Sequence, residues 1–278
     1  MADQDHMPPI AARGILTQFG TNVIHENLDF ELKRGEIVGL VGGSGSGKSV
    51  LMNTLLGLKV PDAGEIRYFG KRRADLDSRE ELRLKNDIGV LFQGGALFSS
   101  LTVRENVMVP MIEHFDMPKS LMRELADMKI HMVGLPPESA TLHPADLSGG
   151  MKKRAGLARS LSLDPRILFL DEPTAGLDPV GADAFDRLIL SLREALNLTV
   201  LMITHDLDSL YAICDRVAVL VDKKIGVYDR LGVVERYDHP WVQEYFGGPR
   251  SRSENAKAVR MAVHPERDAG PPAKAAGR

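Results

Sequence analysis

Eight residues near the start of the chain have the types and spacing needed to hold phosphate groups. They fit the pattern G-x-x-x-x-G-K-[ST], in which glycines let successive backbone N–H groups turn toward phosphate oxygens. An apolar run, Ile37–Val41, precedes them and an apolar, helix-like stretch follows, so a helix N-terminus adds a dipole that favours an anion. Lys48 is expected to reach the β- and γ-phosphates of a nucleotide, and Ser49 to bind Mg²⁺. The predicted phosphate loop consists of Gly42, Gly43, Ser44, Gly45, Ser46, Gly47, Lys48 and Ser49.

Two acids follow another apolar run, Ile167–Leu170. A lone strand that ends in Asp-Glu is usually a solvated turn. In a chain that also has a phosphate loop, the same pair is expected to be functional, because P-loop sheets need an acid there to hold Mg²⁺ through water. Asp171 is assigned that role, and Glu172 is placed to accept a proton from an attacking water. The two motifs together predict binding and hydrolysis of a nucleotide.

Short β-branched runs alternate with helical stretches between about residues 14 and 247, which is the pattern of a parallel α/β sheet. Open sheets of this kind bind ligands at the carboxyl ends of their strands, where the candidate residues lie. Between residues 101 and 147 the strand signal fades and helical spacing replaces it. The predicted strands are Glu36–Val41, Ile88–Phe92, Ile167–Leu170, Thr199–Ile203 and Arg216–Val221.

Composition narrows the class of protein. The chain has 278 residues, 44% of them hydrophobic and 26% charged, as in ordinary globular proteins. A net charge of −3 gives no global basic field, so no nucleic-acid partner is expected. Apolar runs are far shorter than the ~20 residues that span a bilayer, and no secretory leader is apparent. Residues 248–278 carry seven Lys/Arg and three Asp/Glu with little apolar mass, so a flexible, disordered tail is expected.

Further motifs identify a family. Leu147-Ser148-Gly149-Gly150-Met151 resembles the signature motif of ATP-binding cassette (ABC) ATPases, and the other motifs agree with that family in order and spacing. The resemblance implies that Gln93 is the glutamine that touches Mg²⁺ and the lytic water. It likewise implies that His205 contacts the γ-phosphate, that Asp178 belongs to the D-loop at the nucleotide, and that Phe19 stacks on adenine.

The resemblance also implies a fold and an assembly. The expected fold is an α/β P-loop NTPase: a RecA-like parallel sheet core, about 10–92 and 158–247, with an inserted α-helical subdomain, about 93–157. Two copies are expected to face head to tail in the presence of ATP. Each nucleotide then lies between the phosphate loop of one copy and Ser148, Gly149 and Gly150 of the other, because a glycine-rich helix start offers N–H donors to the γ-phosphate.

Several classes of this superfamily have sequence features that this chain lacks. Chromosome-maintenance and double-strand-break-repair ATPases insert long coiled coils between the positions of Gln93 and Ser148, and this chain has no sustained heptads there. Translation-associated members carry two cassettes, whereas this chain has one phosphate loop. The remaining class is a separate ATPase subunit, held by an integral membrane permease at the cytoplasmic face of the inner membrane.

The stretch Leu91–Val107 resembles the Mla-type phospholipid transport ATPases that work with MCE-domain proteins, Gly94-Gly95-Ala96-Leu97-Phe98 being its most telling part. Leu-Ser-Gly-Gly-Met-Lys-Lys-Arg-Ala and Asp-Glu-Pro-Thr-Ala-Gly-Leu-Asp-Pro-Val-Gly-Ala fit the same group. The resemblance implies phospholipid transport between inner and outer membranes, with an MCE-domain protein and a small regulatory subunit as partners. The alternatives are the ATPase subunit of a polar-solute importer and a non-transport regulatory ABC ATPase.

Overall fold

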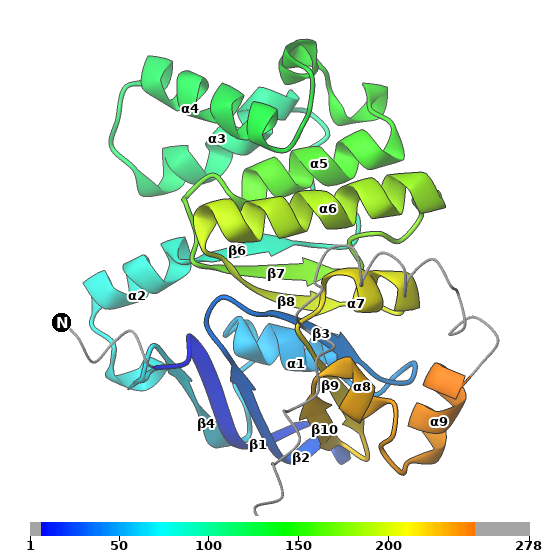
Figure 1. Cartoon of the computed structure of the whole chain (residues 1–278). Helices are drawn as coiled ribbons and strands as arrows, with labels where there is room; N and C mark the ends of the chain where they lie inside the picture. Colours follow the sequence, from blue (N-terminus) through cyan, green and yellow to red (C-terminus); the bar gives the residue numbers. More distant parts are fainter. Residues whose placement is uncertain (1–6, 248–278) are drawn as a thin grey trace, which may run out of the picture.

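A six-stranded sheet forms the centre of the molecule (Figure 1). The computed structural model describes residues 7–247. The strand order is β10-β9-β3-β8-β7-β6, parallel except for the antiparallel edge strand β10. All five strands predicted from the sequence are confirmed, with ends that differ by at most one residue. The strands are β3 (Ile37–Val41), β6 (Ile88–Leu91), β7 (Ile167–Asp171), β8 (Thr199–Ile203), β9 (Arg216–Val221) and β10 (Lys224–Asp229).

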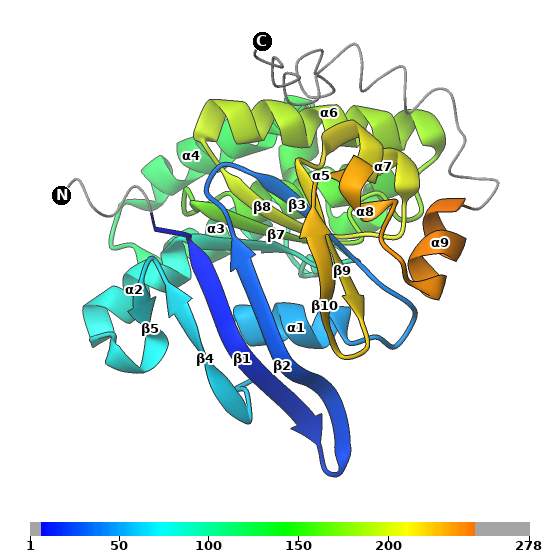
Figure 2. The same ribbon diagram turned by 60° about the horizontal axis from the view of Figure 1, so that its bottom comes forward.

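A second, antiparallel sheet was not predicted from the sequence. Its order is β2-β1-β4-β5, and it lies across the face of the molecule that comes forward in Figure 2. Register shifts interrupt the β1–β2 and β1–β4 pairings, so the alternation of apolar and polar residues that marks a strand is broken. The strands are β1 (Ile10–Phe19), β2 (Asn22–Leu32), β4 (Ala63–Tyr68) and β5 (Lys71–Arg72).

The described part of the chain contains nine α-helices, the last two of which follow the final strand β10. Helices α3, α4 and α5 pack together beyond the β6 edge of the sheet, and α5 also contacts β6 (Figure 1). The helical stretch expected between residues 101 and 147 is confirmed by α3 and α4, and the boundary drawn at 157–158 falls inside α5. The helices are α1 (Lys48–Leu55), α2 (Ser78–Asn86), α3 (Val103–His114), α4 (Lys119–Met132), α5 (Gly149–Ser160), α6 (Pro179–Leu196), α7 (Leu207–Ile213), α8 (Leu231–Val234) and α9 (Pro240–Gly247).

The core is divided between the two faces of the six-stranded sheet. Successive strand residues point to opposite faces, and in β7 Leu168 and Leu170 join the cluster of α5 and α6, whereas Ile167 and Phe169 join that of α1 and the antiparallel sheet. Helix α1, which follows the phosphate loop, therefore lies on the face opposite to α5, which follows the signature motif.

The carboxyl ends of the central strands meet at one edge. Leu40 of β3 pairs with Ile203 of β8, and Ile203 pairs in turn with Asp171 of β7. The residues that follow these three strands are therefore neighbours, as the sequence predicted. Among residues 7–247 no helix is both long and apolar enough to cross a bilayer. The expected flexible tail, 248–278, lies outside the described residues.

Candidate nucleotide-binding and hydrolysis site

The phosphate loop joins β3 to α1. Gly47 is the N-cap of α1 and has a φ of 103°, a conformation that L side chains rarely adopt. A Cβ on Gly47 would also lie 2.6 Å from Ile24 Cγ2 and 2.7 Å from His25 Nε2 in β2. No side chain caps α1, so its first backbone N–H groups are left for a ligand. The loop is thus shaped by glycine and by the antiparallel sheet behind it.

Lys48 lies folded back over this loop. Its Nζ donates hydrogen bonds to the carbonyl oxygens of Gly42, at 2.8 Å, and Gly43, at 3.0 Å. Burial lowers the pKa of Lys48, and the charges of Glu172 and Asp171 oppose that shift. The ammonium group is therefore close to both carboxylates and within the loop that would receive phosphate.

Asp171 and Glu172 end β7 with an abrupt change of direction. Asp171 is the last residue of the strand, and burial raises the pKa of its carboxyl group. The neighbouring charge of Glu172 adds to this rise, whereas Lys153 and Lys48 oppose it. Glu172 has a φ of 50°, which is unusual for a residue with a side chain. This turn directs its carboxylate out of the strand.

His205 meets that carboxylate. Its Nδ1 lies 2.8 Å from Glu172 Oε2, and its side chain is 73% exposed whereas that of Glu172 is 15% exposed. His205 comes two residues after β8, the strand beside β7. The structure therefore brings together the proposed base and the histidine that the family resemblance placed at the γ-phosphate.

The predicted metal ligands are an amide, a hydroxyl and a carboxylate. Gln93 is exposed, two residues after β6, and Ser49 is the second residue of α1. Within residues 7–247 no cluster of three or more His, Cys, Asp or Glu side chains could hold a metal by itself. A magnesium ion here would depend on Ser49, Gln93 and Asp171 together with phosphate oxygens, and oxygen ligands of this kind suit Mg²⁺.

The signature residues begin α5. Ser148 is the N-cap, and its Oγ accepts a hydrogen bond from the backbone N–H of Met151 at 3.2 Å. Ser148 and Gly149 are exposed and Gly150 is partly exposed. Since α5 and α1 lie on opposite faces of the sheet, the signature turn faces solvent instead of adding to the same chain's phosphate loop.

Two residues that are predicted to contact the nucleotide, Asp178 and Phe19, lie at the edge of the candidate site. The carboxylate of Asp178 caps α6 by accepting a hydrogen bond from the Gly181 N–H at 2.7 Å. Phe19, at the end of β1, is 57% exposed, and Lys59 Nζ lies 4.9 Å from its ring centroid. One face of this ring is therefore already in contact with a cation.

Residues that sequence analysis missed lie directly against the site. His25 is fully buried, its Nδ1 is 2.6 Å from Thr17 Oγ1, and burial lowers its pKa to about 4. Lys153 of α5 donates a hydrogen bond to the backbone carbonyl of Glu172 at 2.6 Å. Trp241 Nε1 would lie 3.3 Å from a Cβ on Gly43. One signal was available: Lys153 lies one turn before buried Leu157, on the apolar face of a helix.

Comparisons with known proteins support the fold and identify the family. Residues 25–175 match the family model described as ABC transporter. The chain is 38% identical over 216 residues to MlaF of Haemophilus influenzae, an intermembrane phospholipid transport system ATP-binding protein, covering 78% of this chain and 81% of that protein. It is 35% identical over 241 residues to mkl of Mycobacterium leprae, named a probable ribonucleotide transport ATP-binding protein, covering 87% of this chain and 69% of mkl.

Among solved structures, the dimeric ATP-binding cassette MJ0796 bound to ADP and Pi matches with a TM-score of 0.72 and 30% identity, over 80% of this chain and 98% of that one. The chain therefore belongs to the ABC transporter ATP-binding family, and it is an ATPase.

Proposed function

We propose that the chain is the ATP-hydrolysing subunit of a transporter that moves phospholipid between the inner and outer membranes. The observation that carries this proposal is the 38% identity to MlaF, which spans 81% of that protein. The subunit acts as a head-to-tail homodimer at the cytoplasmic face of the inner membrane, held there by a permease. An MCE-domain protein and a small regulatory subunit complete the complex.

Hydrolysis follows from the residues at the strand ends. The phosphate loop and Lys48 hold the β- and γ-phosphates, and adenine stacks on the face of the Phe19 ring that Lys59 leaves open. Glu172 accepts a proton from the attacking water, and His205 keeps the carboxylate directed toward the γ-phosphate. Ser49, Gln93 and Asp171 would hold Mg²⁺, which would supply positive charge against the phosphate oxygens.

The second copy completes each site. The exposed signature turn at Ser148, Gly149 and Gly150 offers helix N–H groups to the γ-phosphate held by the partner's phosphate loop, and Asp178 lies at the same rim. A nucleotide that contacts both copies stabilises the closed dimer through its differential affinity, and hydrolysis removes that preference.

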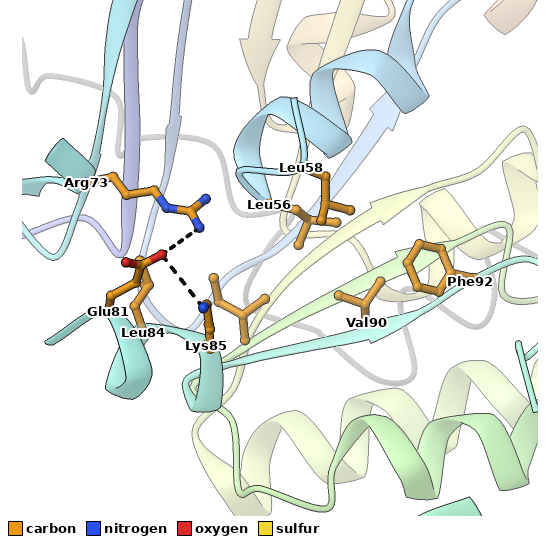
Figure 3. Close-up of a pocket in the computed structure, with 9 residues that line it drawn as sticks. Leu56, Leu58, Arg73, Glu81, Leu84, Lys85, Val90 and Phe92 are labelled. Atoms are coloured by element: carbon orange, nitrogen blue, oxygen red, sulfur yellow. Dashed lines mark hydrogen bonds and ion pairs between the residues drawn. The ribbon is translucent and has the colours of Figure 1, made fainter. Parts of the chain in front are cut away.

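An apolar groove supports docking of a permease (Figure 3). It lies between the end of α1, α2 and β6, and it contains exposed side chains: Leu58 is 69% exposed and Phe92 is 36% exposed. Arg73 and Lys85 both pair with Glu81 at one end, as the dashed lines in the figure show. Phe92 immediately precedes Gln93, so a short permease helix in this groove would contact the segment that reaches the nucleotide.

The segment from Gly94 to Thr102 continues this surface. Buried Asn106 holds it, accepting the Phe98 N–H at 2.7 Å and donating to the Phe98 and Leu101 carbonyls at 3.1 Å. Arg159 of α5 donates to the Ala96 carbonyl and lies over the Phe98 ring. This firm attachment suits a segment that transmits a change at Gln93 to a permease.

The test of cargo is reconstitution of the complex, purified from its native membranes, into liposomes. ATP-dependent transfer of labelled phospholipid is the expected result. The relative mkl, at 35% identity, gives the polar-solute alternative a specific form, a ribonucleotide. Uptake of labelled ribonucleotide with no movement of phospholipid would replace the lipid assignment. A subunit that failed to sediment with native membranes would instead favour a regulatory ATPase.

A further inference from the structure

Lys153 is a buried lysine beneath the hydrolytic edge. It lies on α5, five residues after Ser148, and only 7% of it is exposed, whereas its neighbour Lys152 is partly exposed. Its Nζ donates a 2.6 Å hydrogen bond to the backbone carbonyl oxygen of Glu172. The helix that carries the signature motif is therefore tied directly to the proposed base of the same chain.

If this position served only packing, a lysine would be an unfavourable residue there, because its charge would have to be buried. Removing an ammonium group from water carries a large free-energy penalty. Accordingly, burial lowers the pKa of Lys153, and the charges of Glu172 and Asp171 oppose that shift. The hydrogen bond itself goes to a backbone carbonyl oxygen, and the two carboxylate charges offset the effect of burial only in part. What the lysine provides is a long reach to one peptide group.

That peptide group is the one that aims the base. Glu172 has a φ of 50°, a left-handed backbone conformation that is unfavourable for a residue with a side chain. Such a conformation persists only where the surroundings over-determine it. Here the Glu172 N–H donates to Ile203 O at 2.8 Å, and its carbonyl accepts from the Ala175 N–H at 3.2 Å as well as from Lys153. Of these partners, only Lys153 comes from α5.

We propose that Lys153 is a positioning residue that makes the orientation of Glu172 depend on the position of the signature helix in the same chain. The proposal rests on the base role given to Glu172 above. Ser148 at the start of α5 faces the partner's nucleotide, and Lys153 further along α5 holds the base of its own site. A shift of α5 when the dimer closes therefore sets the direction of the Glu172 carboxylate. The orientation of the base in one site then depends on whether the signature turn of the same chain contacts the partner's nucleotide.

The test compares ATPase kinetics of full-length variants. Lys153→Met removes the charge and the donor at similar length, and Lys153→Arg keeps both. Lys152→Met is the matched control on the adjacent, partly exposed position. Lys153→Met is expected to lower kcat about tenfold, equivalent to about 1.4 kcal/mol, with KM and the Kd for a fluorescent ATP analogue within about twofold. Lys153→Arg is expected to recover most of kcat, and Lys152→Met to behave as wild type.

Combining variants separates this proposal from the base assignment. In a Glu172→Gln background, adding Lys153→Met is expected to change the residual turnover less than about twofold, because no base remains to be oriented. A full tenfold loss there, or a Lys153→Met enzyme with wild-type kcat, overturns the positioning role and leaves the base assignment intact. Near-wild-type turnover of Glu172→Gln alone overturns both.

A variant that fails to fold does not block the test. If the melting temperature of Lys153→Met shows loss of structure, Lys153→Gln, which keeps an N–H donor without charge, takes its place. It is expected to lower kcat more than Lys153→Arg with KM unchanged. A raised KM or Kd with normal kcat in either variant means that Lys153 serves packing alone.

Discussion

The phosphate loop and the signature turn both introduce a helix through glycines, but they do so in opposite ways. The phosphate loop curls around its target: Gly47 has a left-handed φ, no side chain caps α1, and Lys48 lies back across the loop. The signature turn is open and exposed, and Ser148 caps α5 with its own hydroxyl. The first can surround a phosphate within one chain, whereas the second presents a surface that needs a partner's nucleotide to complete it.

This difference teaches that nucleotide binding and nucleotide hydrolysis have separate requirements. Binding depends on one loop. Hydrolysis depends on the strand ends that carry Glu172 and His205, and on whatever brings the exposed α5 N-terminus to a γ-phosphate. Variants of the two regions should therefore change ATP affinity and turnover to different extents, and each prediction below measures both.

Glu172→Gln is expected to have the largest effect. An amide cannot accept the proton of the attacking water, so turnover should fall about 10³-fold. ATP should still bind, and the ATP-bound dimer should accumulate. ATPase assays and gel filtration with ATP measure the two effects, with Glu194→Gln, on an exposed part of α6, as control. Monomers in the presence of ATP would contradict the link between hydrolysis and dimer release.

Lys48→Ala is expected to act on binding. Loss of a charged hydrogen-bond donor costs about 2.7 kcal/mol, which is about 100-fold in ATP affinity. Titration with a fluorescent ATP analogue measures the change, and exposed Lys119→Ala on α4 is the control. An unchanged Kd with lost turnover would mean that Lys48 acts in hydrolysis alone. The phosphate loop and the signature turn would then no longer differ in their effect on ATP binding.

Ser148→Arg is expected to spare binding by the isolated chain. The bulky cation blocks the signature turn, which faces solvent, so the Kd for ATP should remain within about twofold. Turnover should fall about 100-fold, because the γ-phosphate loses donors contributed across the dimer. Ser191→Arg on α6 controls for added charge. A large loss of ATP affinity at low protein concentration would show that Ser148 serves its own chain's site.

Leu58→Glu is expected to have the smallest effect on the isolated chain. The side chain is mostly exposed, so melting temperature, ATP affinity and basal turnover should stay near wild type. Charge in the groove of Figure 3 should nevertheless reduce the fraction that sediments with native membranes. Val60→Glu is the matched control, since Val60 is 81% exposed but does not line that groove. If both variants lost membrane association equally, the added charge itself would be the cause and not its place in the groove.

The sequence predicted the phosphate loop and the central strands well because their chemistry is local. Glycine spacing, a following helix and buried apolar strands are all visible within a short window of residues. Contacts between distant segments were not visible: nothing in the sequence paired Lys153 with Glu172, or placed His25 behind Gly47. The antiparallel sheet escaped for a related reason, because its bulges break the alternating pattern on which strand prediction depends. The roles of the individual site residues stay predictions until variants are measured.

The most direct test of shared sites mixes two inactive variants. A dimer of Lys48→Ala with Ser148→Arg has one site with an intact phosphate loop facing an intact signature turn, whereas each parent homodimer has none. The account predicts that the mixture hydrolyses ATP at up to about a quarter of the wild-type rate: half of the dimers are mixed when pairing is random, and each has one working site of two. Mixed dimers that are shown to form, yet remain as inactive as either parent, would contradict the account.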